Sequence, residues 1–177
     1  NPAALTITAE NETIDYGTAA PAFTVRYDGF KNGDKADKEG VFSGSLGFDC
    51  SYKKGDVTNG QAGNYDIIPK GLKADNYTID YVKGTLTVST VGSSVSIEEV
   101  ASKTYGDAAF DLTVTKSGST AAPKYESSNT SVLTVNADGK VTIKGAGTAT
   151  VTVTLPADNN HNSATDSVSI TVNKKAL

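Results

Sequence analysis

The sequence predicts a mostly β protein built as two β-modules in series. Apolar and polar residues alternate with a period of two along the chain, and helical periodicity is nearly absent. The length of 177 residues is sufficient for two cores in modules of about 90 residues each. A motif also recurs, because Tyr16-Gly17 in TIDYGTAAPAFTV returns as Tyr105-Gly106 in SKTYGDAAFDLTV, 89 positions later (105 minus 16).

Four alternating segments predict strands in the first half: LTITA, FTVRYD, YTIDYV and GTLTVS. Their inward residues are Leu5, Ile7, Phe23, Val25, Tyr27, Tyr77, Ile79, Tyr81, Leu86 and Val88. Between the early and late strands, residues 31–63 are rich in Gly, Lys and Asp and predict turns and short strands. One helical turn is expected near residues 34–39, with Asp34 as its N-cap.

The second half contains four more such segments, FDLTVT, KVTIKG, TATVTVTL and DSVSITV. Their inward residues are Phe110, Leu112, Val114, Val141, Ile143, Ala149, Val151, Val153, Leu155, Val168, Ile170 and Val172. The segment Asn136-Ala137-Asp138-Gly139 predicts a hairpin turn between Val135 and Val141, because Gly139 can adopt the positive φ that hairpin loops often require.

The join between the modules is predicted at about residue 91, where Gly92-Ser93-Ser94 follows the strand that ends near Ser89. The modules are then residues 1–91 and 92–177. The first carries 9 basic and 12 acidic residues and the second 7 and 8, so the net charges are -3 and -1 within a total of -4. This dispersed charge argues against nucleic acid or an anionic membrane as partner, because both require clustered Lys and Arg.

The content of cysteine and methionine indicates the compartment. Cys50 is the single cysteine and cannot form an intrachain disulfide, and the chain contains no Met. The sequence does not open on a charged segment followed by an apolar one, and no apolar run reaches the roughly 18 residues of a membrane span. Low cysteine with abundant Thr, Ser, Gly, Asn and Asp suits extracellular proteins of Gram-positive bacteria. We expect a processed or excised piece of a longer extracellular chain.

The segments YGTAAPAF and AGNYDIIPKGLKADNYTIDYVKGTLTVS, in this order, resemble the mostly-β glycine-rich (MBG-type) repeat domain of large bacterial surface proteins. The resemblance covers residues 5–89 and is most specific over residues 62–88. Within this segment Gly63 and Gly71 predict backbone turns, and alternate residues are expected to face inward. The first module is therefore expected to be an antiparallel β-rich module with at most one short helix.

The segment YESSNTSVLTVNADGKVTIKGAGTATVTVT resembles the bacterial immunoglobulin-like domain of group 2. Its turns are expected at Asp138-Gly139 and at Gly145-Ala146-Gly147. The resemblance implies that the second module is an immunoglobulin-like β-sandwich with Greek-key connections. Since the Tyr-Gly motif opens both modules, we interpret them as related modules with different second halves.

Both resemblances imply a string of modules outside a bacterial cell, and neither family is known for an active site of its own. We expect a non-catalytic, monomeric spacer or stalk segment of a secreted or cell-surface protein, with the neighbouring domains of the same long chain as partners. The alternative is an adhesin module that binds host glycan or protein through its loops or a sheet edge. No catalytic residue, cofactor or metal is assigned, because no nucleophile, base and orienting group occur in a recognisable arrangement.

His161 is the only histidine, and we interpret it as a solvated loop side chain instead of a base or ligand. The loop around it contains oxygen donors that calcium could use, since calcium takes about six to eight oxygen ligands. These residues are Asp158, Asn159, Asn160 and Asn162. The alternative is that they only form turns, for which Asn and Asp are common.

Cys50 shares a strand face with Phe48, and we interpret it as a small buried apolar side chain. The alternative is a thioester, for which Gln61 is the only available Gln. Tyr52 and Tyr125 are candidates for a glycan-binding platform, with core packing as the alternative.

An isopeptide crosslink between Lys and Asn or Asp would require an apolar core, whereas lysines such as Lys83 and Lys140 are predicted at turns or outward positions. The triplets that begin at Asn11, Asn76 and Asn129 are glycan acceptors only in a eukaryotic secretory route.

Overall fold

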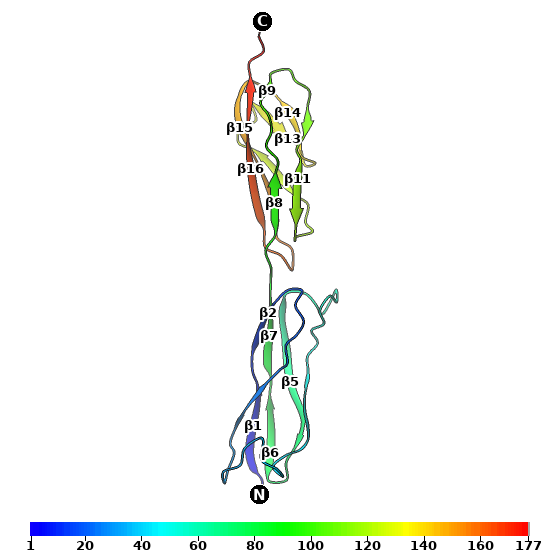
Figure 1. Ribbon diagram of the computed structural model, residues 1–177, viewed down its shortest axis with the longest axis vertical. Helices are drawn as coiled ribbons and strands as arrows, with labels where there is room; N and C mark the ends of the chain where they lie inside the picture. Colours follow the sequence, from blue (N-terminus) through cyan, green and yellow to red (C-terminus); the bar gives the residue numbers. More distant parts are fainter. Residues whose placement is uncertain (177) are drawn as a thin grey trace. The chain divides into compact units, whose positions relative to one another are not determined.

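Strands provide all the regular secondary structure of residues 1–176, the part of the chain that the computed structural model describes (Figure 1). The mostly β fold predicted from the alternation is therefore confirmed. None of these residues lies in a helix long and apolar enough to cross a membrane. The chain divides into two compact units, the first covering Asn1–Ser89 and the second beginning at Thr90.

Two sheets form the first module. Its strands are β1 (Ala3–Ala9), β2 (Glu12–Asp15), β3 (Val25–Asp28), β4 (Ser43–Asp49), β5 (Gly63–Lys73), β6 (Tyr77–Val82) and β7 (Gly84–Ser89). One sheet has the order β3-β1-β6 and the other β2-β7-β5-β4. The pairs β1–β3, β4–β5 and β5–β7 are antiparallel, as predicted for this module.

The first and last strands of this module pair in parallel, which the sequence does not predict. β1 pairs with β6 and β2 with β7 in a single register, in which each residue faces the residue 74 positions later, as Ala3 faces Tyr77 (77 minus 3). Between the two stretches the side-chain Oδ1 of Asn11 accepts a hydrogen bond from the backbone N–H of Thr85 at 2.8 Å. These strands therefore form one parallel ribbon, called the terminal ribbon below (Figure 1).

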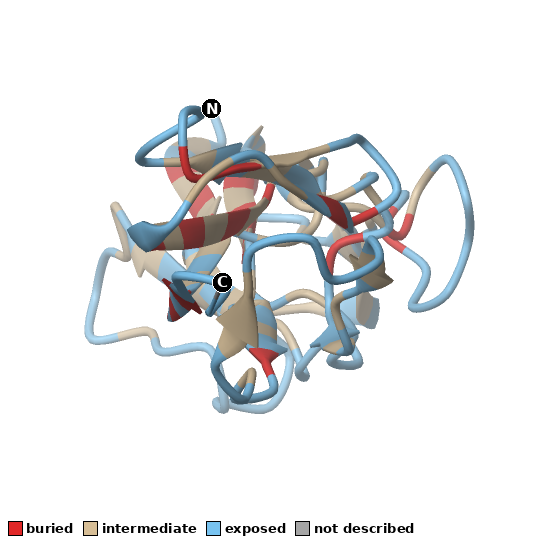
Figure 2. Ribbon diagram, turned by 90° about the horizontal axis from the view of Figure 1, so that it is seen from above, coloured by how far each residue is buried: buried red, intermediate tan, exposed pale blue. Residues whose placement is uncertain are grey.

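Two buried clusters lie within the first module. One contains Ala9, Tyr52, Ile67, Leu86 and Val88, and the other contains Leu5, Ile7, Val41 and Tyr77. The rings of Tyr27, Phe30 and Phe42 pack beside the second cluster, with centroids 5.6 to 5.9 Å apart. Buried residues recur at every second position at the end of β1 and along β7, as the alternation predicts. Figure 2 shows buried residues as short bands along the strands.

The helical turn predicted at residues 34–39 is wrong, because this segment forms successive turns. Asp34 does not cap a helix: its Oδ1 accepts a hydrogen bond from Lys38 Nζ at 2.6 Å and its Oδ2 accepts one from the Tyr77 hydroxyl at 2.8 Å. Those two hydrogen bonds lower the pKa of Asp34. The carboxylate therefore ties this loop to β6 through Tyr77.

The second module has three sheets. Its strands are β8 (Ser94–Ile97), β9 (Lys103–Thr104), β10 (Phe110–Asp111), β11 (Val114–Ser117), β12 (Lys124–Ser127), β13 (Leu133–Val135), β14 (Lys140–Ile143), β15 (Gly147–Leu155) and β16 (Ala164–Asn173). The strand orders are β12-β15-β16-β9, β10-β14-β13 and β11-β8. Only β9 and β16 pair in parallel among the described strands of this module. The immunoglobulin-like sandwich is confirmed.

A single buried cluster joins these sheets. Its residues are Ile97, Val132, Leu133, Val141, Ala149, Val151, Val153, Val168, Ile170 and Val172. The predicted hairpin is present as β13–β14, where Asn136 Oδ1 accepts hydrogen bonds from the N–H groups of Asp138 and Lys140. Gly139 has a φ of 82°, as this turn requires.

The segment FDLTVT is not one strand as predicted. Its first residues form β10, which pairs with β14, and its last residues begin β11, which pairs with β8. The chain therefore leaves one sheet and enters another at Leu112-Thr113.

Candidate functional site

The repeated Tyr-Gly motif has the same backbone geometry in both modules. Tyr16 N–H donates to the carbonyl of Ser89, and Tyr105 N–H donates to the carbonyl of Asn173, each at 2.8 Å. In both modules the strand before the tyrosine pairs in parallel with the last strand, β2 with β7 and β9 with β16. Gly17 follows with a φ of 83° and Gly106 follows Tyr105 with a φ of 100°. The motif therefore ends the parallel pairing of the strand that precedes it with the last strand of the module.

The two tyrosine side chains differ in their surroundings. Tyr16 is partly buried against the cluster that contains Tyr52, and the Tyr52 hydroxyl donates to the carbonyl of Thr18 at 2.6 Å. Tyr105 is 50% exposed. The same motif thus presents a packed ring in the first module and an open ring in the second.

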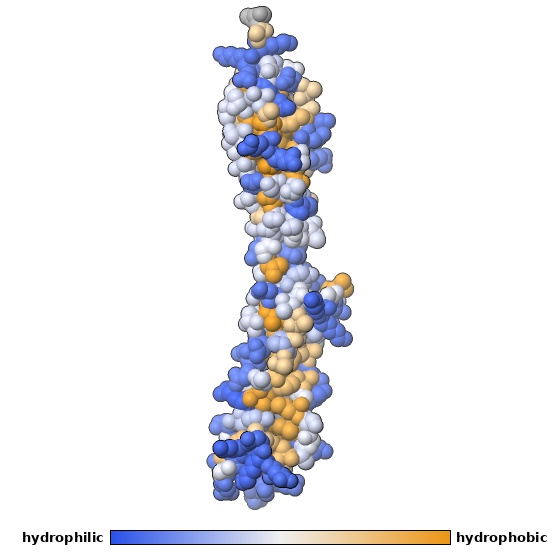
Figure 3. Space-filling model, viewed as in Figure 1, coloured by the Kyte–Doolittle hydropathy of each residue, from blue (hydrophilic) through white to orange (hydrophobic). Residues whose placement is uncertain are grey.

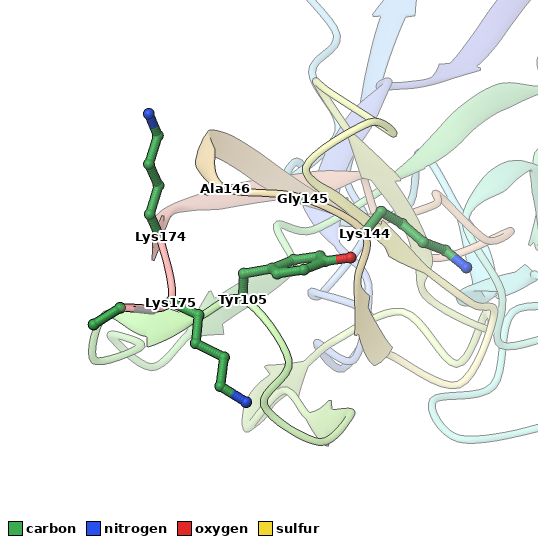
Figure 4. A pocket seen from close by; sticks show the side chains of 7 residues that line it. Tyr105, Lys144, Gly145, Ala146, Lys174 and Lys175 are labelled. Carbon is green, nitrogen blue, oxygen red and sulfur yellow. The ribbon is translucent and has the colours of Figure 1, made fainter.

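A hollow of about 670 Å³ surrounds the Tyr105 ring (Figure 4). Its lining includes the side chains of Lys144, Lys174 and Lys175, and the short turn Gly145-Ala146 lies behind the ring. The Tyr105 hydroxyl points toward Lys144, and Lys175 lies on the other side of the ring. Tyr105 was not predicted as a site residue, because in the sequence the second copy of the motif only repeats the first and gives no sign that its ring is open.

Asp158 lies at the centre of a hydrogen-bond network in the second module. Its Oδ1 accepts from the N–H groups of Asn160 and His161 and lies 2.9 Å from His161 Nδ1. Its Oδ2 accepts from the N–H and the hydroxyl of Thr120. These hydrogen bonds hold the pKa of Asp158 well below its usual range, and the bond from the Thr120 N–H has the largest effect. The loops that contain Thr120 and Asp158 are therefore joined by one carboxylate.

His161 is not the solvated side chain that the sequence predicts, since its side chain is 16% exposed and pairs with Asp158. Two of the four residues proposed as calcium ligands already have hydrogen-bonded side-chain oxygens: Asp158, as described above, and Asn162, whose Oδ1 accepts from the Thr90 hydroxyl at 2.8 Å. Within residues 1–176 no group of three His, Cys, Asp or Glu side chains is placed to hold a metal ion. These contacts give the loop residues a structural function, as in the turn alternative.

Cys50 is half-buried and packs against the cluster that contains Tyr52. Gln61 Nε2 donates to the carbonyl of Val57, within its own loop. The structure thus places the cysteine with apolar neighbours, and the amide of Gln61 is part of a turn.

The two tyrosines proposed as platforms lie in or against the cores. Tyr52 is 6% exposed, and Tyr125 packs against the core of the second module.

Lys83 forms a 2.9 Å ion pair with Asp66 in which both side chains are more than half exposed, so these groups lack the apolar surroundings of an isopeptide site. Asn129 Oδ1 accepts from the N–H of Ser131, and Asn11 is part of the terminal ribbon.

Two family models match the chain. Residues 5–87 match the MBG domain of the YGX type, and residues 110–157 match the intimin immunoglobulin-like domain. The chain therefore contains a segment of the MBG type followed by a segment of the immunoglobulin-like type. The predicted arrangement of two modules is confirmed. The immunoglobulin-like model that matches is the intimin type, whereas the resemblance read from the sequence pattern is to the bacterial group 2 type. Both types are found in extracellular structural or adhesion modules.

Solved structures similar to this MBG and immunoglobulin-like chain have low sequence identity. Drosophila N-cadherin EC1-4 is 14% identical with a TM-score of 0.42, covering 99% of this chain and 50% of its own. A 282-residue C-terminal fragment of intimin, in complex with the intimin-binding domain of the translocated intimin receptor, is 18% identical with a TM-score of 0.31, covering 85% and 57%. A SusE-like surface located polysaccharide binding protein from Bacteroides thetaiotaomicron is 13% identical with a TM-score of 0.32, covering 97% and 34%.

The chain thus spans half the length of the cadherin fragment and about a third of the polysaccharide binding protein. A comparison with curated protein sequences gives no match.

Proposed function

We propose that this chain is a non-catalytic structural spacer, a stalk segment of an extracellular bacterial cell-surface protein that carries tension between its neighbouring domains. The observation that supports this function is the parallel pairing of early with late strands: β1 with β6 and β2 with β7 in the first module, and β9 with the last strand, β16, in the second. The module boundary belongs to the same proposal and lies near residue 91.

Parallel terminal strands resist extension because of their direction. Tension pulls the start of β1 and the end of β7 in opposite directions, so β1 must slide past its partner β6 and β2 past its partner β7. The hydrogen bonds of the terminal ribbon lie across this direction and share the load, whereas a peeled antiparallel pair loses its bonds one after another. The resistance is kinetic, because forced unfolding follows the unfolding rate.

The second module has a shorter parallel contact. β9 pairs with β16 only at Lys103 with Val172 and Thr104 with Asn173. A further parallel bridge joins Val91 to His161. With fewer bonds loaded together, this module should yield at a lower force than the MBG domain.

Single-molecule stretching tests the proposal. In a Cys50→Ala background, the full chain is pulled either from its two ends or from cysteines introduced as Asn64→Cys and Thr90→Cys. The second geometry peels β5 from β7, since Asn64 faces Thr87 in an antiparallel pair. We expect the MBG domain to unfold at a higher force when it is pulled from the ends. Equal or lower force in that geometry contradicts the proposal.

The adhesin alternative has one observation in its favour. Val57 is 83% exposed, and apolar residues are visible at the surface of the first module (Figure 3). Its loop is ordered by Asp56, whose Oδ1 accepts from the N–H groups of Thr58 and Asn59. Exposed side chains on ordered loops are frequent recognition elements. Saturable binding to mucin or matrix proteins that Val57→Ser abolishes would establish this alternative.

A further inference from the structure

We propose that the hollow around Tyr105 is a binding subsite for the acidic sugar units of a polyanionic glycan. Such a site goes beyond a spacer function, because it would attach the second module to a polymer. Three features of the hollow support it: an open aromatic ring, an excess of positive charge and an ordered backbone beneath.

The ring supplies the apolar part of the site. Tyr105 is 50% exposed, and within residues 1–176 its hydroxyl has no hydrogen-bond partner. A tyrosine in this state offers a flat apolar face for the C–H groups of a sugar ring and a hydroxyl for its oxygens. Its counterpart Tyr16 cannot do this, because it packs against the cluster that contains Tyr52.

The lysines supply the charge. Lys144, Lys174 and Lys175 line the hollow, no Asp or Glu does, and none of the three ammonium groups forms an ion pair with another described residue. The nearby Asp107 uses its carboxylate to accept from the N–H of Thr104. Three of the seven basic residues after residue 91 thus line this one hollow, although that half of the chain has a net charge of -1 (7 minus 8). Carboxylate or sulfate groups are the complementary ligands.

The backbone holds the ring in place before any ligand arrives. Tyr105 N–H is bonded to Asn173, and Gly106 adopts a φ of 100° so that the chain can turn there. A Cβ at Gly106 would lie 3.9 Å from Cδ of Lys175, which shows that the aliphatic part of this lysine lies beside the turn. The Tyr105 backbone is therefore held at the end of the β9–β16 pairing, and Lys174 and Lys175 directly follow β16.

An acidic polysaccharide fits these features better than nucleic acid does. A single ring beside three lysines can bind one sugar unit and its acidic group. A nucleic acid strand requires a longer basic track with several stacking rings, and no such track occurs in a chain with a total charge of -4.

Calorimetry of the full chain with oligogalacturonate tests the proposal, with dextran of equal length as the neutral glycan and a DNA duplex as the other polyanion. We expect saturable binding of oligogalacturonate that weakens with added salt, because salt screens exposed charges. Dextran and DNA should not bind. Absence of oligogalacturonate binding, or equal binding of dextran or DNA, overturns the proposal.

Variants locate the site. Tyr105→Ala should weaken binding by about tenfold or more, as truncation of a central aromatic contact does, and Tyr105→Phe should largely retain it. Lys174→Gln with Lys175→Gln should weaken binding and reduce its salt dependence. The matched control is Lys124→Gln with Lys140→Gln, which removes the same charge outside the hollow. Equal losses in the two lysine pairs would show that only net charge matters and would overturn the site.

Discussion

A single carboxylate, that of Asp158, joins two loops of the immunoglobulin-like domain through backbone N–H groups and the ring of His161. Sequence reasoning identified this loop as rich in oxygen donors and weighed calcium against turns. It could not show that Thr120, 38 positions earlier, supplies the donor, because that contact depends on tertiary structure.

Asp158 should make the stability of the second module depend on pH. The folded-state pKa of Asp158 is lowered, while its unfolded-state pKa is about 3.9. Its stabilisation is therefore complete above about pH 4 and is lost as the pH falls further, because the unfolded chain takes up the proton first. We expect Asp158→Asn to lower the melting temperature at pH 7 and to reduce its fall between pH 5 and pH 3, measured by circular dichroism.

The control for this prediction is Asp111→Asn, which changes an exposed carboxylate in the same module. If Asp158→Asn and Asp111→Asn gave the same pH profile, the network around Asp158 would not be the source of the effect.

At the scale of strands, the pairing of β4 with β5 depends on two glycines. Gly71, which the sequence predicts as a turn, lies within β5 with a φ of 96°. A Cβ there would collide with the carbonyl oxygen of Ser45, and a Cβ at Gly44 would collide with that of Gly71. The register shifts between Gly44 and Gly47, so these glycines permit close contact at an irregularity of the ladder.

Gly71→Ala should destabilise the first module more than Gly55→Ala does. Both glycines have a positive φ, which costs an alanine about 1–2 kcal/mol, but Gly55 has open space around its Cα. The additional loss of unfolding free energy in Gly71→Ala, compared with Gly55→Ala, gives the cost of the collision with β4. Chemical denaturation of both variants gives this difference, and equal losses would contradict the description of the β4–β5 contact.

Alternation predicted most strands because the burial of one sheet face imposes a period of two on the sequence. The segments YTIDYV and GTLTVS coincide with β6 and β7. Alternation does not specify partners or direction, so the terminal ribbon and the division of FDLTVT between two sheets could not be predicted. In the sequence Asn11 stands out only as the start of a glycan-acceptor triplet. In the structure its side chain accepts a hydrogen bond from the Thr85 N–H and so bridges the two stretches of the terminal ribbon.

At the scale of the whole molecule, we propose that the two modules fold independently. Ile170 is fully buried in the core of the second module, and a buried unpaired charge is costly. Ile170→Asp should therefore unfold this module, since whole domains are stable by only about 5–15 kcal/mol. The MBG domain should retain its own unfolding transition.

Nuclear magnetic resonance spectra of Ile170→Asp check this prediction, because resonances of residues 1–89 should keep their native positions. Ile67→Asp is the reciprocal variant, with its charge in the first module. Loss of both sets of resonances in either variant would show that the modules do not fold separately.

The 74-residue register of the terminal ribbon also determines when the MBG domain can form. A chain that leaves the ribosome or a secretion channel from its amino end presents β1 and β2 long before their partners β6 and β7. Contacts this distant in sequence form late, because the loop must close before they are gained. The terminal ribbon therefore cannot close until β7 has emerged, and until then the segment lacks the resistance to tension that the ribbon would give it.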